Sequence, residues 1–537
     1  MGDTSNTHKP IRIHDTVHGY ISLPWEYAVR FVDTPQFQRL RRIEQSAVRS
    51  LFPTARHDRF THSLGVYHVG CLIENHFREE MNAEYLSEYK DIYKKLFNEY
   101  PEIVKSYKIA CLLHDVGHAP FSHTFENFFG GDDIKNLESD LRDALKEELT
   151  SIELEKFKND YNETKKKRKS PKPHEFTSAI ICANSFGESI HQSDALIDYV
   201  ARMILGVKFE TSLDEQEQLV NIFIELLHGE TIDADRLDYA CRDTWASGYC
   251  TSSVDMRRLI YAMHIRKTDK GVLLCYNDKV VNEIESLLNV KDFQIRYIFN
   301  HHVVVYDQYL LQTAAKTMAR EFFSHPFYDN KGVELSSEEE QQNKAMACFI
   351  NINALTAEDV RYHPKSKQKE LEQFNIAHIA DEDILFLMKQ TENSYYKEWA
   401  SRQYKYYPLW KTRDEYHSLF PESIGKATPS INNFKNTILS ALGLTDPNRI
   451  IIRPVEFKGK TVLSNLMLWS NEKVVEYDAI HPRVDTLYEQ QKETIFYVYY
   501  RKSFAKEQYN EQEKERKELL GKLVEPINNF YRNKIID

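Results

Sequence analysis

Histidine and aspartate side chains that could bind a metal ion gather in one short stretch of the sequence. The segment from Leu112 to His123 reads LLHDVGHAPFSH, in which His114 and Asp115 are adjacent. Adjacent residues on an α-helix point about 100° apart, so both can reach one ion only if that ion lies across the helix end. A buried Asp beside a buried His is costly unless it is paired or bound to a metal. A metal site is one interpretation, and a hydrogen-bonded core histidine is the other.

Two further residues favour the metal interpretation. His62 lies upstream in RFTHSLGV, and Asp235 lies downstream in IDADRLDYACRD. Two imidazoles and two carboxylates from three helices suit one divalent transition metal, Mn²⁺, Fe²⁺, Ni²⁺ or Zn²⁺. Such a set leaves coordination positions open for water and a phosphate oxygen. The order of these residues along the chain is a more specific signal than the His-Asp pair alone.

The elements that would position these residues are mainly helices. Gly117 and Pro120 are expected to end the helix that carries His114. Apolar residues recur at the three- and four-residue spacing of amphipathic helices over residues 26–47, 61–80, 101–114, 174–205, 216–228, 232–246, 253–264 and 279–322.

Two strongly charged segments interrupt this pattern. Residues 165–169 read KKKRK, and residues 335–343 read LSSEEEQQN. We expect both to be solvated loops. The basic loop, at about residues 160–173, could alternatively contact phosphates or single-stranded nucleic acid.

Beyond about residue 325 the sequence changes character. Short β-like runs at residues 449–457, 473–477 and 494–500 precede a charged helix at residues 503–523. The sequence therefore predicts a mostly α fold, with a helical core at residues 1–325 and a smaller α+β region at residues 326–537. We assign oligomerisation or regulation to the second region.

Composition excludes several classes of protein. The chain has 537 residues, of which 42% are hydrophobic and 28% charged, as in ordinary globular proteins. The net charge of −11 disfavours a broad electropositive surface for duplex DNA. Seven scattered cysteines without a C-x-x-C motif argue against a disulfide framework and a thiolate zinc site. No apolar run approaches the ~18 residues that span a bilayer, so we expect a cytoplasmic protein without a membrane partner.

The longer motifs resemble those of the HD-domain dNTP triphosphohydrolases. The matching stretches are IHDTVHGYISL, DTPQFQRLRRIEQ, RFTHSLGV, LLHDVGHAPFSHTFE, PHEF and IDADRLDYACRD. They are similar both to the branch that carries a sterile alpha motif and to bacterial dGTPase-like proteins, over residues 10–320, and we expect no sterile alpha motif ahead of them. The resemblance implies an HD-domain helical core that cleaves a dNTP at the α-phosphate into a deoxynucleoside and inorganic triphosphate.

The resemblance also implies the cofactors and the catalytic group. The metal ligands that it implies are His62, His114, Asp115 and Asp235, and a Mg²⁺ ion could bridge the triphosphate. The leaving 5′-alkoxide favours a general acid, for which His123 is our candidate. Glu126, three residues later, can orient the other ring nitrogen if this stretch is helical, although the family often has Asp there. The second candidates beside the triphosphate, which could instead be ordinary loop residues, are His118, His174 and Glu175.

A larger set of residues is implied to contact the substrate. Tyr239 would stack on the deoxyribose and leave no room for a ribose hydroxyl, while Asp243 and Gln45 would bind the 3′-hydroxyl. Arg236 stands where the relative has Lys, so a planar guanidinium with several donors replaces the point charge of an ammonium group. The full implied set is Gln45, Arg59, Arg236, Tyr239, Asp243, Phe299 and Asn300.

An activating nucleotide is a further implication. In the family, DTPQFQRLR recognises such a nucleotide, and here it offers Asp33, Gln38 and Arg41. The alternative is that this segment only packs the core. Activation in the family joins subunits, so we expect a homo-oligomer, a dimer or a tetramer.

Two rival functions remain open. One is another HD phosphohydrolase, either a phosphodiesterase for cyclic or signalling nucleotides or a single-strand nuclease. The other is a nucleotide-sensing regulatory protein that acts on a partner. The sugar-reading set of Gln45, Tyr239 and Asp243 favours the dNTP triphosphohydrolase.

Overall fold

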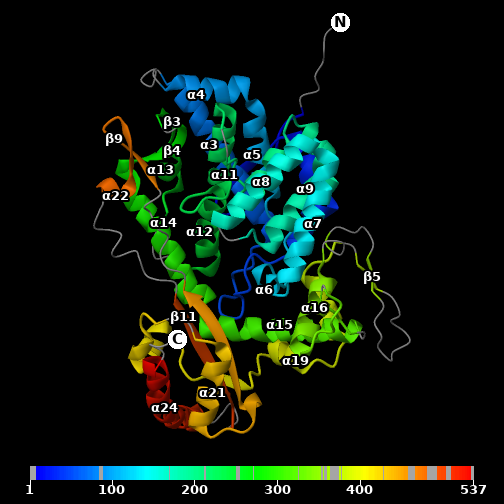
Figure 1. Cartoon of the computed structure of the whole chain (residues 1–537), viewed down its shortest axis with the longest axis vertical. Helices are drawn as coiled ribbons and strands as arrows, with labels where there is room; N and C mark the ends of the chain where they lie inside the picture. Colours follow the sequence, from blue (N-terminus) through cyan, green and yellow to red (C-terminus); the bar gives the residue numbers. More distant parts are fainter. Residues whose placement is uncertain are drawn as a thin grey trace. The chain divides into compact units, whose positions relative to one another are not determined.

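The fold is mostly α, as the sequence predicts, with a few small sheets (Figure 1). This computed structural model describes residues 8–83, 89–167, 170–210, 213–249, 254–269, 271–323, 326–329, 331–351, 355, 360–362, 374–376, 378–426, 429–457, 466–480, 493–503 and 509–533.

The chain divides into two compact units that interleave along the sequence. The first unit contains residues 1–290, 315–392 and 463–482, and the second contains residues 291–314, 393–462 and 483–537. The predicted domain boundary near residue 325 remains a proposal. Parts of the chain beyond that residue nevertheless pack within the first unit.

In the first unit, α3 packs on both α5 and α12. The helices that lie in or begin in this unit are α1 (Trp25–Tyr27), α2 (Pro35–Gln38), α3 (Arg59–Asn82), α4 (Lys90–Lys94), α5 (Pro101–Leu113), α6 (His123–Glu126), α7 (Gly131–Glu148), α8 (Ser151–Lys167), α9 (Pro173–His191), α10 (Ile197–Leu205), α11 (Glu215–Leu227), α12 (Ala234–Ser247), α13 (Met256–Tyr261), α14 (Val281–Phe293), α16 (Glu338–Phe349), α18 (Asp381–Lys389) and α22 (Tyr477–Ile480).

The strands of the first unit form small sheets around these helices. β1 (Ile11–Asp15) and β2 (Gly19–Leu23) make an antiparallel hairpin, as do β5 (Val360–Tyr362) and β6 (Phe374–Ile376). A four-stranded sheet has the order β10-β9-β4-β3, from β3 (Met263–Thr268), β4 (Gly271–Asn277), β9 (Met467–Ser470) and β10 (Lys473–Glu476). Its β4 and β9 are parallel, so a segment from late in the sequence completes a sheet of the first unit.

The second unit is a three-stranded antiparallel sheet covered by helices. Its strands, β7 (Tyr406–Pro408), β8 (Ile450–Phe457) and β11 (Glu493–Arg501), have the order β7-β11-β8. Phe434 of α21 stacks on Phe496 of β11 with ring centroids 4.5 Å apart, within an aromatic core. The helices that lie in or begin in this unit are α15 (His302–Phe322), α19 (Ser394–Ser401), α20 (Arg413–Leu419), α21 (Ile431–Leu442) and α24 (Tyr509–Arg532).

Several predicted helices are shorter or broken. Residues 26–47 split because Pro35 has no amide hydrogen and begins a new helix, after a π-helical turn at Ala28–Val32. Residues 174–205 split into α9 and α10 at a turn in which Asp194 has φ 52°. Residues 253–264 give only α13 before β3, and residues 279–322 split into α14, a π-helical turn at Gln294–Phe299 and α15. Apolar spacing locates these segments but does not show their breaks.

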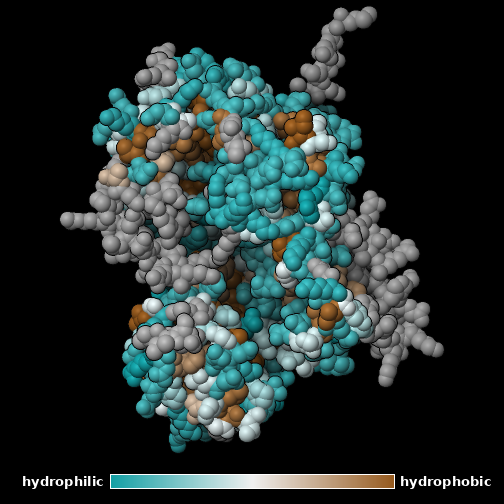
Figure 2. Space-filling view, in the orientation of Figure 1, coloured by the Kyte–Doolittle hydropathy of each residue, from teal (hydrophilic) through white to brown (hydrophobic). Residues whose placement is uncertain are grey.

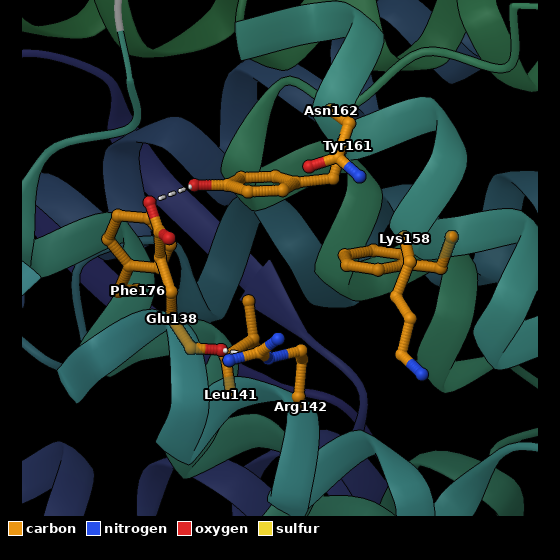
Figure 3. Close-up of a pocket in the computed structure, with 8 residues that line it drawn as sticks. Glu138, Leu141, Arg142, Lys158, Tyr161, Asn162 and Phe176 are labelled. Carbon is orange, nitrogen blue, oxygen red and sulfur yellow. Dashed lines mark hydrogen bonds between the residues drawn. The ribbon is translucent and has the colours of Figure 1, made fainter. Parts of the chain in front are cut away.

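The prediction that both charged segments are loops is wrong over most of their length, because each is largely helical. α8 continues to Lys167, where Lys165, Lys166 and Lys167 pair with Glu138, Glu163 and Glu210 respectively. Figure 3 shows Tyr161 of α8 donating to Glu138 of α7 across a pocket of about 120 Å³. Residues 168–169 lie outside the described residues.

The acidic segment also begins a helix. Ser337 and Glu340 cap the start of α16 reciprocally, Ser337 accepting from the Glu340 amide and Glu340 from the Ser337 amide. This capping box satisfies amide hydrogens that would otherwise lack partners, and so fixes the helix start within a run of charge.

Hydrophilic side chains predominate on the face of the molecule in Figure 2, with hydrophobic ones in separate patches. Among the helices in the described ranges, none is both long enough and apolar enough to cross a bilayer.

A close approach of two backbones makes Gly117 a test of this packing. A Cβ there would lie 2.3 Å from the Ser178 amide nitrogen and 2.5 Å from the Thr177 carbonyl carbon. We expect Gly117→Ala to lower the free energy of unfolding by about 1–3 kcal/mol, because backbone cannot move aside as a side chain can. Urea denaturation followed by circular dichroism measures this change.

Gly131→Ala is the matched control. Gly131 is the first residue of α7, and a Cβ there meets nothing within 4 Å. This control should unfold at an unchanged or slightly higher urea concentration. Equal stability of the two variants would contradict the packing argument.

Candidate metal centre and active site

Helix ends bring the four predicted metal ligands together. His62 lies in the first turn of α3, whose N-cap Asp58 accepts from the Thr61 amide. His114 caps the C-terminus of α5 and Asp115 follows it, and Asp235 is the second residue of α12. The interpretation of His114 and Asp115 as residues at a helix end is thus confirmed, since α5 ends at Leu113.

The ligand atoms of these residues converge on one point. The Nε2 atom of His62 lies 3.0 Å from Oδ1 of Asp235 and 3.5 Å from Oδ2 of Asp115. Nε2 of His114 lies 3.5 Å from the same Asp115 oxygen and 3.8 Å from the same Asp235 oxygen. The Asp235 side chain is 40% exposed, so the centre opens to solvent on that side.

Hydrogen bonds orient both imidazoles toward this point. Nδ1 of His114 lies 2.9 Å from the Cys111 carbonyl oxygen, which can only accept, so Nδ1 carries the hydrogen. Nδ1 of His62 is 2.7 Å from Oδ2 of Asp238. Both Nε2 atoms are buried and have no hydrogen-bond partner of good geometry among the described residues.

This arrangement fits a divalent cation. With Nδ1 of His114 protonated, the Nε2 lone pair of the neutral ring faces carboxylate oxygens, an arrangement that is repulsive unless a cation lies between them. The site has two imidazole nitrogens and two carboxylates, which is a donor set for mid-series transition ions. His62, His114, Asp115 and Asp235 would hold the ion.

The ionisation of the ligands agrees with this charge arrangement. Burial disfavours the Asp115 carboxylate, but Arg59, His114 and His62 hold the pKa of Asp115 well below its usual range. Burial likewise opposes a charge on His62, yet its contacts with Asp235 and Asp238 raise the pKa of His62 to about 10. A cation at this point would take the place of that proton.

A second cluster adjoins the first and contains the predicted acid. Nδ1 of His123 lies 2.7 Å from Oε2 of Glu126, and Nδ1 of His174 contacts the other oxygen, Oε1. Glu126 thus orients two imidazoles, as α6 makes possible by being helical. The His123 side chain is 54% exposed, and it can therefore meet a substrate.

His118 joins the two clusters. Its ring stacks on His174 with centroids 4.1 Å apart, and its Nε2 lies 3.6 Å from Oδ1 of Asp115. Burial and the nearby charge of Arg59 hold the pKa of His118 well below its usual range, so its ring is neutral. Burial opposes charge on His174 as well, but Glu126 raises the pKa of His174.

A cavity of about 160 Å³ lies beside the metal ligands. Sequence reasoning missed two of its basic residues, Lys172 before α9 and His228 after α11; the only signal for Lys172 was its position before the PHEF motif. The lining residues used below are His114, Lys172, His174, His228, Asp235 and Arg236.

The two predicted phosphate-binding arginines are placed differently. Arg236 lines the cavity, with its Nε 3.4 Å from the Tyr239 hydroxyl. Arg59 is buried, donating to Oδ2 of Asp115 at 2.6 Å and to the Gln45 carbonyl at 3.2 Å. Its guanidinium therefore already supports the predicted metal ligand Asp115, and its contact with phosphate remains a prediction.

Gln45 and Asp243, which are predicted to bind the sugar, are connected through His57, a residue without a predicted role. Nε2 of His57 lies 2.6 Å from Oδ1 of Asp243, and the His57 carbonyl accepts from the Gln45 amide at 3.1 Å. Oε1 of Gln45 is buried without a hydrogen-bond partner among the described residues. Tyr239 is half-buried one turn after Asp235 on α12.

Phe299 and Asn300 belong to the second unit, whose sheet Asn300 contacts by donating to the Glu456 carbonyl at 2.9 Å. Their predicted contacts with sugar and base remain predictions.

The predicted activator residues lie on the surface around α2. Gln38 donates to the Val32 carbonyl at 2.9 Å and accepts from Nε of Arg41 at 2.8 Å. The Arg41 guanidinium lies 3.4 Å from the centre of the Phe60 ring, and Asp33 is exposed. The structure brings Gln38 and Arg41 together, and a nucleotide there remains a prediction.

Asp238 provides a test of the metal centre that leaves its ligands intact. Its buried carboxylate contacts His62, His18 at 2.6 Å and Arg242 at 2.8 Å. Asp238→Asn keeps the shape but presents an amide NH₂ to one of these donors. We expect the affinity for Mn²⁺ to fall about 10- to 100-fold in a competition titration against a fluorescent chelator.

Asp160→Asn is the control, because Asp160 of α8 is equally buried but pairs with Arg202 at 2.9 Å. It should lower stability and leave Mn²⁺ affinity unchanged. Wild-type affinity in Asp238→Asn would show that the orientation of His62 is not what tunes the site.

The HD domain family matches residues 59–175, which include His62, His114, Asp115 and His123. The deoxynucleoside triphosphate triphosphohydrolase SAMHD1 of Gallus gallus is 29% identical over 306 residues, which are 54% of this chain and 42% of that protein. SAMHD1 of Homo sapiens is 28% identical over 307 residues, again 54% and 42%.

A viral protein matches over a similar stretch. The putative HD domain-containing protein L394 of Acanthamoeba polyphaga mimivirus is 27% identical over 292 residues, which are 54% of this chain and 53% of that protein. The chain thus spans less than half the length of the SAMHD1 proteins that it matches.

Proposed function

Because the chain carries an HD domain and is a homologue of SAMHD1 dNTP triphosphohydrolases, we propose that it hydrolyses dNTPs at the α-phosphate. The products are a deoxynucleoside and inorganic triphosphate. The observation that carries this proposal is the pair of buried Nε2 atoms of His62 and His114, directed at the carboxylates of Asp115 and Asp235 beside a cavity that Lys172 and Arg236 help to line.

His62, His114, Asp115 and Asp235 would hold a divalent cation, which would supply a lowered pKa for bound water and charge withdrawal from a phosphate. The chain's own residues orient that site: Asp238 holds His62, the Cys111 carbonyl holds His114, and Arg59 holds Asp115. The identity of the metal, Mn²⁺, Fe²⁺, Ni²⁺ or Zn²⁺, and a Mg²⁺ ion on the triphosphate belong to the proposal.

His123 is the proposed general acid for the 5′-oxygen. Burial lowers the pKa of His123, although Glu126 opposes this change. Because Nδ1 faces Glu126, the imidazolium form would present Nε2–H away from that carboxylate. Protonation of the leaving oxygen at Nε2 avoids a free alkoxide, which is a poor leaving group. Glu126 replaces the family's usual Asp and also holds His174.

The cavity provides the charge for the triphosphate. A bound triphosphate carries about four negative charges, which a net-acidic protein must offset locally. Arg236 and Lys172 lie in the cavity lining with His174 and His228. Glu175 at the same lining accepts from the Lys172 amide and so fixes the start of α9.

Selection of deoxyribose is the role proposed for Tyr239, Gln45 and Asp243. Tyr239 would cover the sugar at C2′, and the buried Oε1 of Gln45 offers an acceptor that has no partner among the described residues. Activation by a nucleotide at Asp33, Gln38 and Arg41, a homodimer or homotetramer and a cytoplasmic location complete the proposal.

The contacts of the basic segment give little support to the alternative hypothesis of a single-strand nuclease. The lysines at the end of α8 that suggested single-strand binding already pair with Glu138, Glu163 and Glu210. Pairing lowers the net charge that a polyanion would meet.

Product analysis tests the proposed reaction. The Mn²⁺-loaded protein is incubated separately with each dNTP, each NTP, cyclic nucleotides and single-stranded DNA, and the products are resolved by ion exchange. We expect deoxynucleoside and tripolyphosphate from dNTPs only, and none from Asp115→Ala, which should also lose its metal. Release of monophosphate and pyrophosphate would overturn the proposal.

His123→Ala tests the acid. We expect kcat to fall about 10²- to 10⁴-fold while dNTP affinity is retained, because the proton is needed only in the transition state. His191→Ala is the control, since His191 forms a similar pair with Glu148 at 2.9 Å on the surface of α9. A defect in affinity alone would contradict the acid role.

A further inference from the structure

A carboxylate from a late part of the sequence holds the loop that precedes His123. Asp381, the first residue of α18, belongs to the first unit and is buried. Its Oδ1 accepts from the Phe121 amide at 2.6 Å, and its Oδ2 accepts from the Glu44 amide at 2.9 Å. One side chain therefore joins the loop before His123, the stretch before Gln45 and the start of α18.

A second contact holds the other end of the same loop. The buried Arg39 donates from one terminal nitrogen to the Ile379 carbonyl at 3.0 Å. Its other terminal nitrogen donates to the carbonyls of Val116 and His118, at 2.9 and 2.7 Å. Residues 379–381 are thus linked to both ends of the loop from Val116 to Ser122.

The loop needs such support because of its backbone. Phe121 has φ 56° and Ser122 has φ 51°, in the left-handed region that non-glycine residues seldom adopt. Two strained residues in succession persist only when their surroundings hold them. Ser122 also donates through Oγ to the Glu44 carbonyl and accepts from Nε of Arg59. His123 follows directly.

Helix capping does not account for Asp381. The start of α18 is capped by Asp383, whose Oδ2 accepts from the Ala380 amide at 2.8 Å. Both oxygens of Asp381 instead accept from backbone amides of other segments, those of Phe121 and Glu44.

We propose that Asp381 is a positioning residue: through Phe121 and Glu44 it fixes where His123 stands relative to the metal ligands and Gln45. The inference rests on the proposed function, since it gives His123 the role of acid. It also assigns a part in the active site to residues 379–381, far along the chain from every motif.

Asp381→Asn tests the positioning role, because Asn keeps the shape but turns an NH₂ toward one of the two amides. We expect kcat to fall about 10- to 100-fold, with KM and Mn²⁺ content unchanged. Asp383→Asn is the matched control: it makes the same change two residues later in the same helix, where the Asn oxygen can still accept from the Ala380 amide, and its kcat should equal that of wild type. Equal losses in both variants would overturn the proposal.

The double variant separates positioning from a general structural effect. If Asp381 acts through His123, then Asp381→Asn should cause no further loss of kcat in a His123→Ala background. If the fold-loss of kcat in the double variant instead equals the product of the two single losses, the proposal is overturned. Should Asp381→Asn fail to fold, Ser122→Ala, which removes the Ser122 link to Glu44, takes its place in the same cycle.

Hydrogen exchange gives a readout that does not depend on activity. The peptide that covers residues 117–122 should exchange faster in Asp381→Asn than in wild type or Asp383→Asn, and an unchanged rate would overturn the proposal. If wild type hydrolyses no dNTP, the proposed function fails, whereas the exchange result still decides whether Asp381 holds the loop.

Discussion

The close approach of two imidazole nitrogens to carboxylate oxygens is the constraint on which the proposed metal site depends. Nε2 of His62 and Nε2 of His114 lie 3.0–3.8 Å from oxygens of Asp115 and Asp235. Packed helix ends hold these atoms together. A cation would relieve the repulsion at neutral His114 and would take the place of the proton that His62 otherwise carries. A core histidine with satisfied hydrogen bonds, the other interpretation of the His-Asp pair, does not describe nitrogens that are buried without partners.

The surrounding fold maintains that arrangement through charge. Asp238 holds His62 and is itself held by His18 and Arg242, and Arg242 donates to Asp15 at 2.8 Å. The β1–β2 hairpin thereby supports the proposed metal ligand His62 on α3. Gly65 allows α3 to approach α12 closely, because a Cβ at this position would lie 1.9 Å from an Asp238 oxygen. Removing one partner would leave a buried charge uncompensated.

Residue type and spacing could predict that His62, His114, Asp115 and Asp235 lie together, because each lies in a short motif at a helix end. Orienting residues such as Asp238 and His57 lie inside or beside those motifs, but only three-dimensional contacts reveal their partners. Asp381 carries no sequence signal, since its role depends on a contact with residues 260 and more positions away. Helix breaks and the capped start of α16 were likewise local backbone effects that apolar periodicity does not report.

Anomalous diffraction from a crystal soaked in Mn²⁺ tests the central claim most directly. The predicted result is a strong peak enclosed by Nε2 of His62, Nε2 of His114 and oxygens of Asp115 and Asp235. Absence of a peak there, or a peak only among His118, His123, Glu126 and His174, which could also surround an ion, would contradict the assignment of the metal centre.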